Sequence, residues 1–289
     1  MSTGAEPLLP FTAHRMDLGG GEQTIADDRG EDPLCALSTA ALGLALGGFA
    51  GQRVLDLGSL EGGFTIAFAR LGASEAIGVE ARELNLRRAN WARDRLGVAR
   101  ASFQRGDVIE LGSMGLGTFD AVFASGILYH LTDPFTFVEK VFTMTRDVAL
   151  FDTNVALPAV NNHDTGPLIT REHGGHRYEG RVFTEFPEPP GALDLEAAVW
   201  SAWGNTNSFW LTERSLVELL DAVGFTYLHK VITPAGYQCG PGCPPDCRVL
   251  YVAKRRLMAG SSRRRRAFPR VTARPARALL GAARTGQQH

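Results

Sequence analysis

Cysteine is scarce in this chain, and so are the patterns that would direct it to a membrane. The 289 residues include four cysteines, three of them between Cys239 and Cys247. So few clustered thiols do not predict a disulfide scaffold. The uncharged stretch 34–50 is shorter than the roughly 20 residues a bilayer needs and contains three glycines, so we expect a helix packed on a sheet. The N-terminus also lacks the basic and apolar regions of a signal peptide, which predicts a cytoplasmic protein without membrane association.

Acidic residues are missing from the C-terminal end. Eleven of the 30 Lys and Arg lie from Lys254 onward, where there is no Asp or Glu. Residues 1–253 therefore carry 19 basic and 31 acidic residues, a net charge of −12 that the overall −1 conceals. Domains that grip RNA with their body are usually basic, so this charge disfavours a nucleic-acid substrate. The tail 256–289 is predicted to be disordered, and its run 263–266 is either solvated or a phosphate-binding segment.

Residues 54–63, Val-Leu-Asp-Leu-Gly-Ser-Leu-Glu-Gly-Gly, are the most informative in the chain. A short apolar strand runs through Asp56 into a turn that begins at Gly58, and residues 64–71 are then apolar at helical spacing. Such a junction lets a nucleotide-like ligand approach the backbone at the carboxyl end of a parallel strand. In the dinucleotide fingerprint the second glycine admits a pyrophosphate, and here Leu60 takes that position. Leu60 and Asp56 therefore disfavour a phosphate-bearing ligand, and Asp56 suits an ammonium group.

Further segments extend the pattern. The second strand ends in Glu80, whose carboxylate can accept hydrogen bonds from two ribose hydroxyls. A third strand over 101–108 closes on Gly-Asp-Val, where Asp107 can accept a hydrogen bond from an adenine amino group. A fourth strand over 119–125 leads into a polar, aromatic loop. In this order and spacing, the segments resemble the class I S-adenosylmethionine-dependent methyltransferases over roughly residues 14–255.

The resemblance implies a fold, a cofactor and a set of cofactor-binding residues. The fold would be α/β, a doubly wound, Rossmann-like sheet of seven mostly parallel strands, with an antiparallel terminal hairpin from 225–233 and 248–254 and a cap insertion. The cofactor would be S-adenosylmethionine. The residues that match the cofactor pocket are Asp56, Gly58, Gly62, Glu80, Asp107, Val108 and Ser125. Leu60 is a departure, since the family usually has glycine there.

The remaining patterns divide the chain into three parts. Residues 1–32 are expected to be irregular or a lid, with a hairpin over 14–21 near the mouth of the pocket. Residues 33–255 form the methyltransferase domain. Within it, the Pro-rich stretch 156–207 interrupts the alternation of helix and strand and is predicted to be the cap insertion. A helix with Thr212 as its N-cap follows it.

A narrower resemblance concerns the substrate. Residues 126–134 and 207–225 are similar to enzymes that complete wobble-uridine carboxymethylation in tRNA, and to their small-molecule-modifying relatives. The tRNA enzymes hold a carboxylated cofactor with an N-terminal lysine, and here no lysine precedes Lys140. Ordinary methyl transfer is therefore favoured over carboxymethyl transfer. The same resemblance places Arg248 near the substrate.

Tyr129 and His130 follow the fourth strand, where a substrate would meet the methyl group. Methyl transfer from a sulfonium requires alignment of the nucleophile and exclusion of water, and a weakly acidic nucleophile also requires a base. His130 is the candidate base or orienting residue, with Tyr129 beside it as a second candidate catalytic residue. Alternatively, the two residues only close the loop and pack the next helix.

The remaining histidines and cysteines that could bind a metal do not have the spacing of a known metal site, and we expect no bound metal. The candidates are His163, His173 and His176 in the insertion and Cys239, Cys243 and Cys247 near the terminal hairpin. The histidines would contact substrate, be solvated or hold a metal, and the cysteines would form a plain loop or hold zinc. The aromatic residues Trp200, Trp203, Phe209 and Trp210 are either core or a wall for a flat substrate.

The sequence as a whole predicts a methyltransferase that acts on an oxygen or nitrogen of a small molecule. A tRNA-modifying methyl- or carboxymethyltransferase, recruited by the basic tail, is the alternative. A non-catalytic protein that keeps only the cofactor fold is a third reading, and the intact Glu80 and Asp107 argue against it. The oligomeric state is left open.

Overall fold

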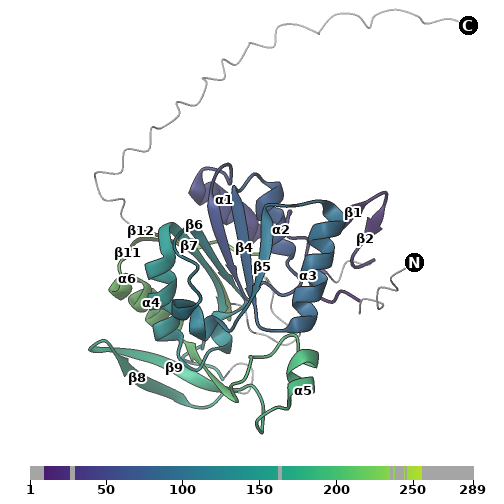
Figure 1. Cartoon of the computed structure of the whole chain (residues 1–289). Helices are drawn as coiled ribbons and strands as arrows, with labels where there is room; N and C mark the ends of the chain where they lie inside the picture. Colours follow the sequence, from purple (N-terminus) through teal and green to yellow (C-terminus); the bar gives the residue numbers. More distant parts are fainter. Residues whose placement is uncertain are drawn as a thin grey trace, which may run out of the picture. The chain divides into compact units, whose positions relative to one another are not determined.

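The computed structural model describes residues 10–26, 30–161, 165–234, 237, 244 and 246–255. A seven-stranded sheet forms its main layer (Figure 1). In spatial order the strands are β11 (Phe225–Val231), β12 (Arg248–Arg255), β7 (Thr145–Asn154), β6 (Phe119–Ser125), β3 (Arg53–Leu57), β4 (Glu75–Glu80) and β5 (Ala101–Arg105). β12 is antiparallel to both neighbours, and all other neighbours are parallel. The predicted doubly wound sheet with an antiparallel terminal hairpin is confirmed.

Helices cover both faces of the sheet because its central strands are apolar on both sides. The first six residues of β6 are buried, whichever face they point to. One face packs against α1 (Leu37–Leu46), α2 (Gly63–Arg70) and α3 (Glu83–Leu96). The other packs against the short 3-10 helix η1 (Val108–Ser113), α4 (Pro134–Met144) and α6 (Glu213–Val223).

Local sequence signals set the ends of α4 and α6. The side chain of Asp133 accepts hydrogen bonds from the amides of Phe135 and Thr136, and Pro134 occupies the first helical position. Thr212 caps α6 by accepting from the amide of Ser215, and Gly224 ends it with a φ of 111°. The helix expected after Thr212 is therefore confirmed.

The N-terminal segment contains the predicted hairpin, formed by β1 (Asp17–Gly19) and β2 (Glu22–Gln23). The apolar stretch 34–50 contains α1, which has 10 residues and ends at Gly47. Among the ranges that the structure describes, no helix is long and apolar enough to cross a membrane.

The segment between β7 and α6, where the cap insertion is predicted, has secondary structure of its own. It contains a three-stranded antiparallel sheet of β8 (Leu168–His173), β9 (His176–Thr184) and β10 (Asn207–Leu211), together with α5 (Ala192–Ala197). The prolines flank these strands instead of interrupting them, as strand geometry requires. Figure 1 shows the β8–β9 hairpin and α5 beyond one end of the main sheet. We call residues 156–207 the cap. The domain limits near residues 33 and 255 stay predictions.

Several predictions concern residues outside the described ranges. These are the disorder of the tail, the role of His163, and the zinc alternative at Cys239 and Cys243. Cys247 is described: it is fully buried and disulfide-bonded, so its sulfur is not a free thiolate for a metal.

Candidate functional site

A cavity of about 500 Å³ lies at the carboxyl ends of the central strands. This is where the strand order reverses, since β3 has β4 on one side and β6 on the other. The cavity volume is within the range of about 300–1,000 Å³ that is usual for small-molecule sites. Except for Gly62, every residue predicted to bind the cofactor or to act in catalysis lines it.

The turn after β3 approaches the cavity with its backbone. Gly58 has a φ of 71°, and a Cβ there would lie 3.1 Å from Ile127. Leu60 has the left-handed φ of 46°, and its amide donates to Glu80. Gly62 does not line the cavity; a side chain there would collide with Phe103 and other neighbours packed behind the turn. Its glycine therefore serves the packing of the turn.

Asp56 and Glu80 place two buried carboxylates on the cavity wall. Asp56 accepts a hydrogen bond of 2.6 Å from the hydroxyl of Thr65, and burial raises the pKa of Asp56 to about 7. Glu80 accepts from the amide of Leu60 with one oxygen and from that of Arg82 with the other. Burial also raises the pKa of Glu80. A cation or a set of hydroxyl donors would offset the desolvation of both groups.

Asp107 and Val108 line the cavity beyond β5, as the sequence predicts. The Asp107 carboxylate caps η1 by accepting from the amide of Ile109 at 3.0 Å. Burial raises the pKa of Asp107 as well. Because Asp107 lines the cavity, its carboxylate can also accept a hydrogen bond from a ligand amine.

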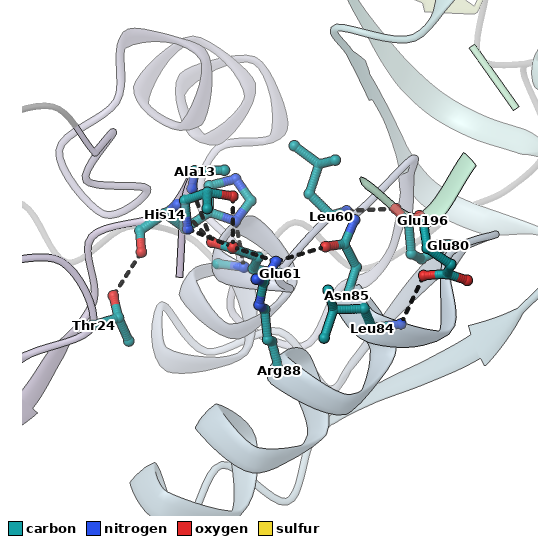
Figure 2. Close-up of polar contacts among 12 residues, drawn as sticks. Ala13, His14, Thr24, Leu60, Glu61, Glu80, Leu84, Asn85, Arg88 and Glu196 are labelled. Atoms are coloured by element: carbon teal, nitrogen blue, oxygen red, sulfur yellow. Dashed lines mark hydrogen bonds and ion pairs between the residues drawn. The ribbon is translucent and has the colours of Figure 1, made fainter. Parts of the chain in front are cut away.

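The N-terminal segment closes one side of the cavity, because Glu61 fastens it to the turn. The two carboxylate oxygens of Glu61 accept from the amides of Thr12, Ala13 and His14, at 2.6–3.1 Å. Arg88 of α3 forms an ion pair with Glu61 at 3.1 Å, and both side chains are at most 4% exposed. Figure 2 shows Glu61 between His14 and Arg88. The lid expected near the mouth of the pocket is thus tied down through its backbone.

His14 is itself part of the cavity wall. Its Nδ1 accepts a hydrogen bond of 3.1 Å from the amide of Gly63, at the start of α2. Burial lowers the pKa of His14 to about 4, although the charge of Glu61 opposes the shift. The imidazole is therefore neutral at physiological pH.

A buried ion pair stands at the end of the cavity nearest β7 and β12. Arg248 Nε lies 2.7 Å from Asp152, and the two side chains are 8% and 0% exposed. Asp152 also accepts from the hydroxyls of Ser125, at 3.0 Å, and Tyr237, at 3.3 Å. Burial opposes the charge of Arg248, but Asp152 outweighs it and raises the arginine's pKa. Arg248 also lies 5.5 Å from the ring centre of Tyr129, so the arginine expected near the substrate does line the cavity.

Tyr129 and His130 lie in the 3-10 helix η2 (Leu128–His130), with ring centres 4.2 Å apart. Nδ1 of His130 is 3.0 Å from one oxygen of Glu185, which follows β9 in the cap. The second oxygen of Glu185 accepts from the amide of Ala202. An ionised carboxylate can only accept, so for this contact to be a hydrogen bond to ionised Glu185, Nδ1 must carry a proton.

Arg82 fastens the cap to the start of α3. Its guanidinium donates to the carbonyls of Leu195, Ala198 and Ser201 at 2.7–2.8 Å, and to that of Ala202 at 3.4 Å. The carboxylate of Glu196 accepts from the first two amides of α3, at 2.9 and 3.1 Å. Both sets of contacts hold the cap at the start of α3.

The predicted aromatic cluster divides into two pairs. Trp200 and Trp203 line the cavity from the cap, and Trp200 remains 64% exposed. Phe209 and Trp210 are buried in the core. The wall interpretation therefore applies to one pair and the core interpretation to the other.

Two histidines of the cap, His173 and His176, lie within the described residues. His173 pairs with Glu139 of α4 through Nε2 at 2.7 Å, and His176 lies across the turn from it on β9. Within the part of the chain that the structure describes, no three metal-ligating side chains come together.

The comparisons agree with this geometry. The profile of the family described as "Methyltransferase domain" matches residues 49–156, which hold β3 to β7 and the glycine turn. The chain carries a class I S-adenosylmethionine-dependent methyltransferase domain. A search of curated proteins gave no match.

Solved structures of methyltransferases share the fold of this domain. The N-terminal domain of EvdMO1 with SAH bound is 25% identical, with a TM-score of 0.58, over 78% of this chain and 82% of that one. The same domain in the presence of SAH and D-fucose is 24% identical, with a TM-score of 0.60, over 82% and 89%. A methyltransferase from Mesorhizobium loti is 19% identical, with a TM-score of 0.50, over 77% and 100%. This chain spans 42% of the whole EvdMO1 chain.

The residues of the methyltransferase cavity suit S-adenosylmethionine. Gly58 lets the ligand approach the backbone, and a side chain there would be strained at its φ of 71°. Asp56 and Glu80 provide desolvated acceptors for an ammonium group and for hydroxyls. The cavity is lined by the acids Asp56, Glu80 and Asp107 and also by Arg248 of β12.

Four functional side chains escaped the sequence analysis. Asp152 follows the rule that identified Glu80, an acid near the end of a buried strand, and lies opposite Ser125 in the sheet register. Glu61 directly precedes Gly62 in the turn after β3. Arg82 and Glu185 gave no sequence signal, because their partners are distant in the chain.

Proposed function

We propose that the protein is an S-adenosylmethionine-dependent methyltransferase of a small molecule and methylates an oxygen or nitrogen atom. The observation that carries the proposal is one cavity with two chemically different ends. Asp56, Glu80 and Asp107 border one end, and Tyr129, His130 and Arg248 border the other. A cofactor at the first end would present its methyl group to a substrate at the second.

The three acids have distinct roles in this proposal. Asp56 faces the ammonium group of the cofactor, Glu80 accepts hydrogen bonds from the ribose hydroxyls, and Asp107 accepts one from the adenine amino group. Val108 packs against the adenine, and Ser125 lines the cavity above Asp152. The cofactor supplies an electrophilic methyl group on a sulfonium, and the protein aligns the acceptor and keeps water out.

The size and closure of the cavity favour a small substrate. The cap covers one side through Trp200 and Trp203, and the N-terminal segment covers another through Thr12 to His14. A cavity of about 500 Å³ must hold both cofactor and acceptor. The acidic body also disfavours tRNA. The expected cytoplasmic location rests on the sequence alone.

His130 is the proposed base, and Tyr129 beside it is the second proposed catalytic residue. His130 lines the cavity and is 13% exposed, so a ligand can reach its ring. Replacing His130 by glutamine should lower turnover and leave cofactor affinity unchanged.

Calorimetric titration with S-adenosylmethionine, with NAD as the parallel control, tests the proposal. Micromolar binding of S-adenosylmethionine without binding of NAD supports it. A panel of hydroxyl, amine and carboxylate acceptors, with tRNA as a further arm, then identifies the substrate through release of S-adenosylhomocysteine. Methylation of tRNA that is lost at high salt would refute the small-molecule assignment, and the absence of cofactor binding would refute the whole proposal.

A further inference from the structure

The contact between His130 and Glu185 joins the catalytic loop to the cap across 55 residues of sequence. His130 is 13% exposed and lines the cavity, whereas the side chain of Glu185 is 1% exposed. The histidine is therefore accessible to a ligand, and the carboxylate is not.

The backbone around Glu185 is fixed. The amides of Glu185 and Phe186 both donate to the carbonyl of Thr206, next to β10. One carboxylate oxygen also accepts from the amide of Ala202 at 3.0 Å. These bonds hold the carboxylate in one place relative to the cap sheet.

The loop that carries His130 is fixed to the same sheet. The side-chain amide of Asn205 donates to the carbonyl of His130 at 3.0 Å, and the amide of Phe209 donates to the carbonyl of Leu131 at 2.9 Å. The hydroxyl of Thr132 donates to the carbonyl of Asn207 at 2.6 Å. His130 and Glu185 therefore face each other from segments that are both hydrogen-bonded to residues 202–209.

This arrangement decides which ring nitrogen can react. Nδ1 lies 3.0 and 3.2 Å from the two oxygens of Glu185, so its N–H donates to the carboxylate and the lone pair of the neutral ring is on Nε2. A carboxylate that orients a neutral imidazole also stabilises the imidazolium formed when the ring accepts a proton. Such a base is needed when the acceptor must lose a proton on methylation. An ionised carboxylate acceptor has no proton to lose and does not need a base.

We propose that Glu185 is the positioning residue of His130 and that the two together prepare the site to methylate a neutral hydroxyl group. This inference rests on the proposed function. As the hydroxyl oxygen bonds to the methyl carbon, its proton passes to Nε2 of His130. The electron pair of the broken carbon–sulfur bond goes to sulfur, so the positive charge moves from the sulfonium to the imidazolium beside Glu185. The base is complete only when the cap is in place, because Glu185 belongs to the cap.

The test is the tautomer of His130 in the free protein, read by two-bond ¹H–¹⁵N correlation spectra of ¹⁵N-histidine-labelled protein at pH 8. The His130 signals are assigned by their loss in His130→Gln. We expect the Nδ1–H tautomer in the wild type and a mixed or reversed tautomer in Glu185→Gln, because the new amide can donate to Nδ1. Glu188→Gln makes the same chemical change at an exposed position three residues away and should leave the spectrum unchanged.

His173 is an internal reference, since it meets Glu139 through Nε2 instead. Its signals should respond to Glu139→Gln and ignore Glu185→Gln. An Nε2–H tautomer for His130 in the wild type, a doubly protonated ring at pH 8, or a spectrum unaffected by Glu185→Gln would each overturn the proposal.

Kinetics with an acceptor from the panel separate positioning from simple support of the cap. Glu185→Gln should lower kcat by at least about tenfold with KM nearly unchanged, within the 10²–10⁴-fold that general bases contribute. The double variant with His130→Gln should be no slower than His130→Gln alone, because Glu185 acts through the histidine. The proposal would be overturned if the effects of the two substitutions on kcat multiplied in the double variant, or if carboxylates were the preferred acceptors. Calorimetry distinguishes failure of the proposed function from failure of the proposed role of Glu185. A wild-type protein that binds no S-adenosylmethionine refutes the proposed function, whereas the tautomer of His130 tests the role of Glu185 independently of cofactor binding.

Discussion

The buried carboxylate of Glu61 joins the N-terminal segment to the cofactor turn and to α3, and its replacement by glutamine gives a sharp stability prediction. Glu61 is 0% exposed and its partner Arg88 is 4% exposed. Removing one charge of a buried ion pair leaves the other uncompensated, which typically destabilises a protein by about 3–5 kcal/mol. In Glu61→Gln, the side-chain oxygen of the glutamine can still accept a hydrogen bond from the backbone amides, but its NH₂ group, which replaces the second oxygen, cannot.

The matched control is Glu75→Gln. Glu75 pairs with Arg53 at 2.6 Å, but these side chains are 42% and 30% exposed, so water screens the pair. Exposed pairs contribute at most about 1 kcal/mol. We therefore expect Glu61→Gln to lower the free energy of unfolding several times more than Glu75→Gln does.

Urea denaturation measures the two free energies, and amide hydrogen exchange reports on the segment itself. The amides of Ala13 and His14 donate to Glu61 and should lose protection in Glu61→Gln. The reasoning is refuted if the two variants agree within about 1 kcal/mol and these amides remain protected.

Three further predictions concern ionisable groups of the cavity. The pKa of Asp56 is raised to about 7, so binding of an ammonium group should displace the proton from the Asp56 carboxyl group. Cofactor affinity should therefore rise from pH 5.5 to 7, and calorimetry should detect the release of a proton on binding. Asp56→Asn should abolish both effects. Glu80→Gln should weaken cofactor binding at least about tenfold, a loss of about 1.4 kcal/mol, whereas Glu83→Gln at the exposed start of α3 should not; equal affinities would remove Glu80 from the ribose. His14 stays neutral down to about pH 4 when folded but takes up a proton near 6.5 when unfolded, so it contributes less stability as the pH falls through that window. The stability advantage of wild type over His14→Gln should shrink by about 2 kcal/mol between pH 7.5 and 5, with Asp56 cancelling because both proteins contain it; a constant difference in urea denaturation would contradict the burial argument.

Prediction from sequence succeeded where one short segment contains the whole physical cause. The turn after β3 needs glycine at Gly58 because of its φ of 71°, and Asp56 is the acid next to the last residue of an apolar strand, so both can be predicted from the local sequence. Thr212 and Gly224 bound α6 for the same reason. The sequence indicates the position of the cap through its prolines but not its strands β8, β9 and β10, because the prolines flank these strands.

The sequence by itself determined the order of the strands of the main sheet, the glycine turn after β3 and the acids at or just after the ends of β4 and β5, since periodicity, capping and turn geometry act over a few residues. Only the tertiary structure decided which distant side chains meet. Arg248 reaches Asp152 across 96 residues and His130 reaches Glu185 across 55. Burial of these charges is tolerable only because each meets its partner, and that meeting depends on how the sheet and the cap pack. The chemistry of the substrate end is therefore a property of the folded chain.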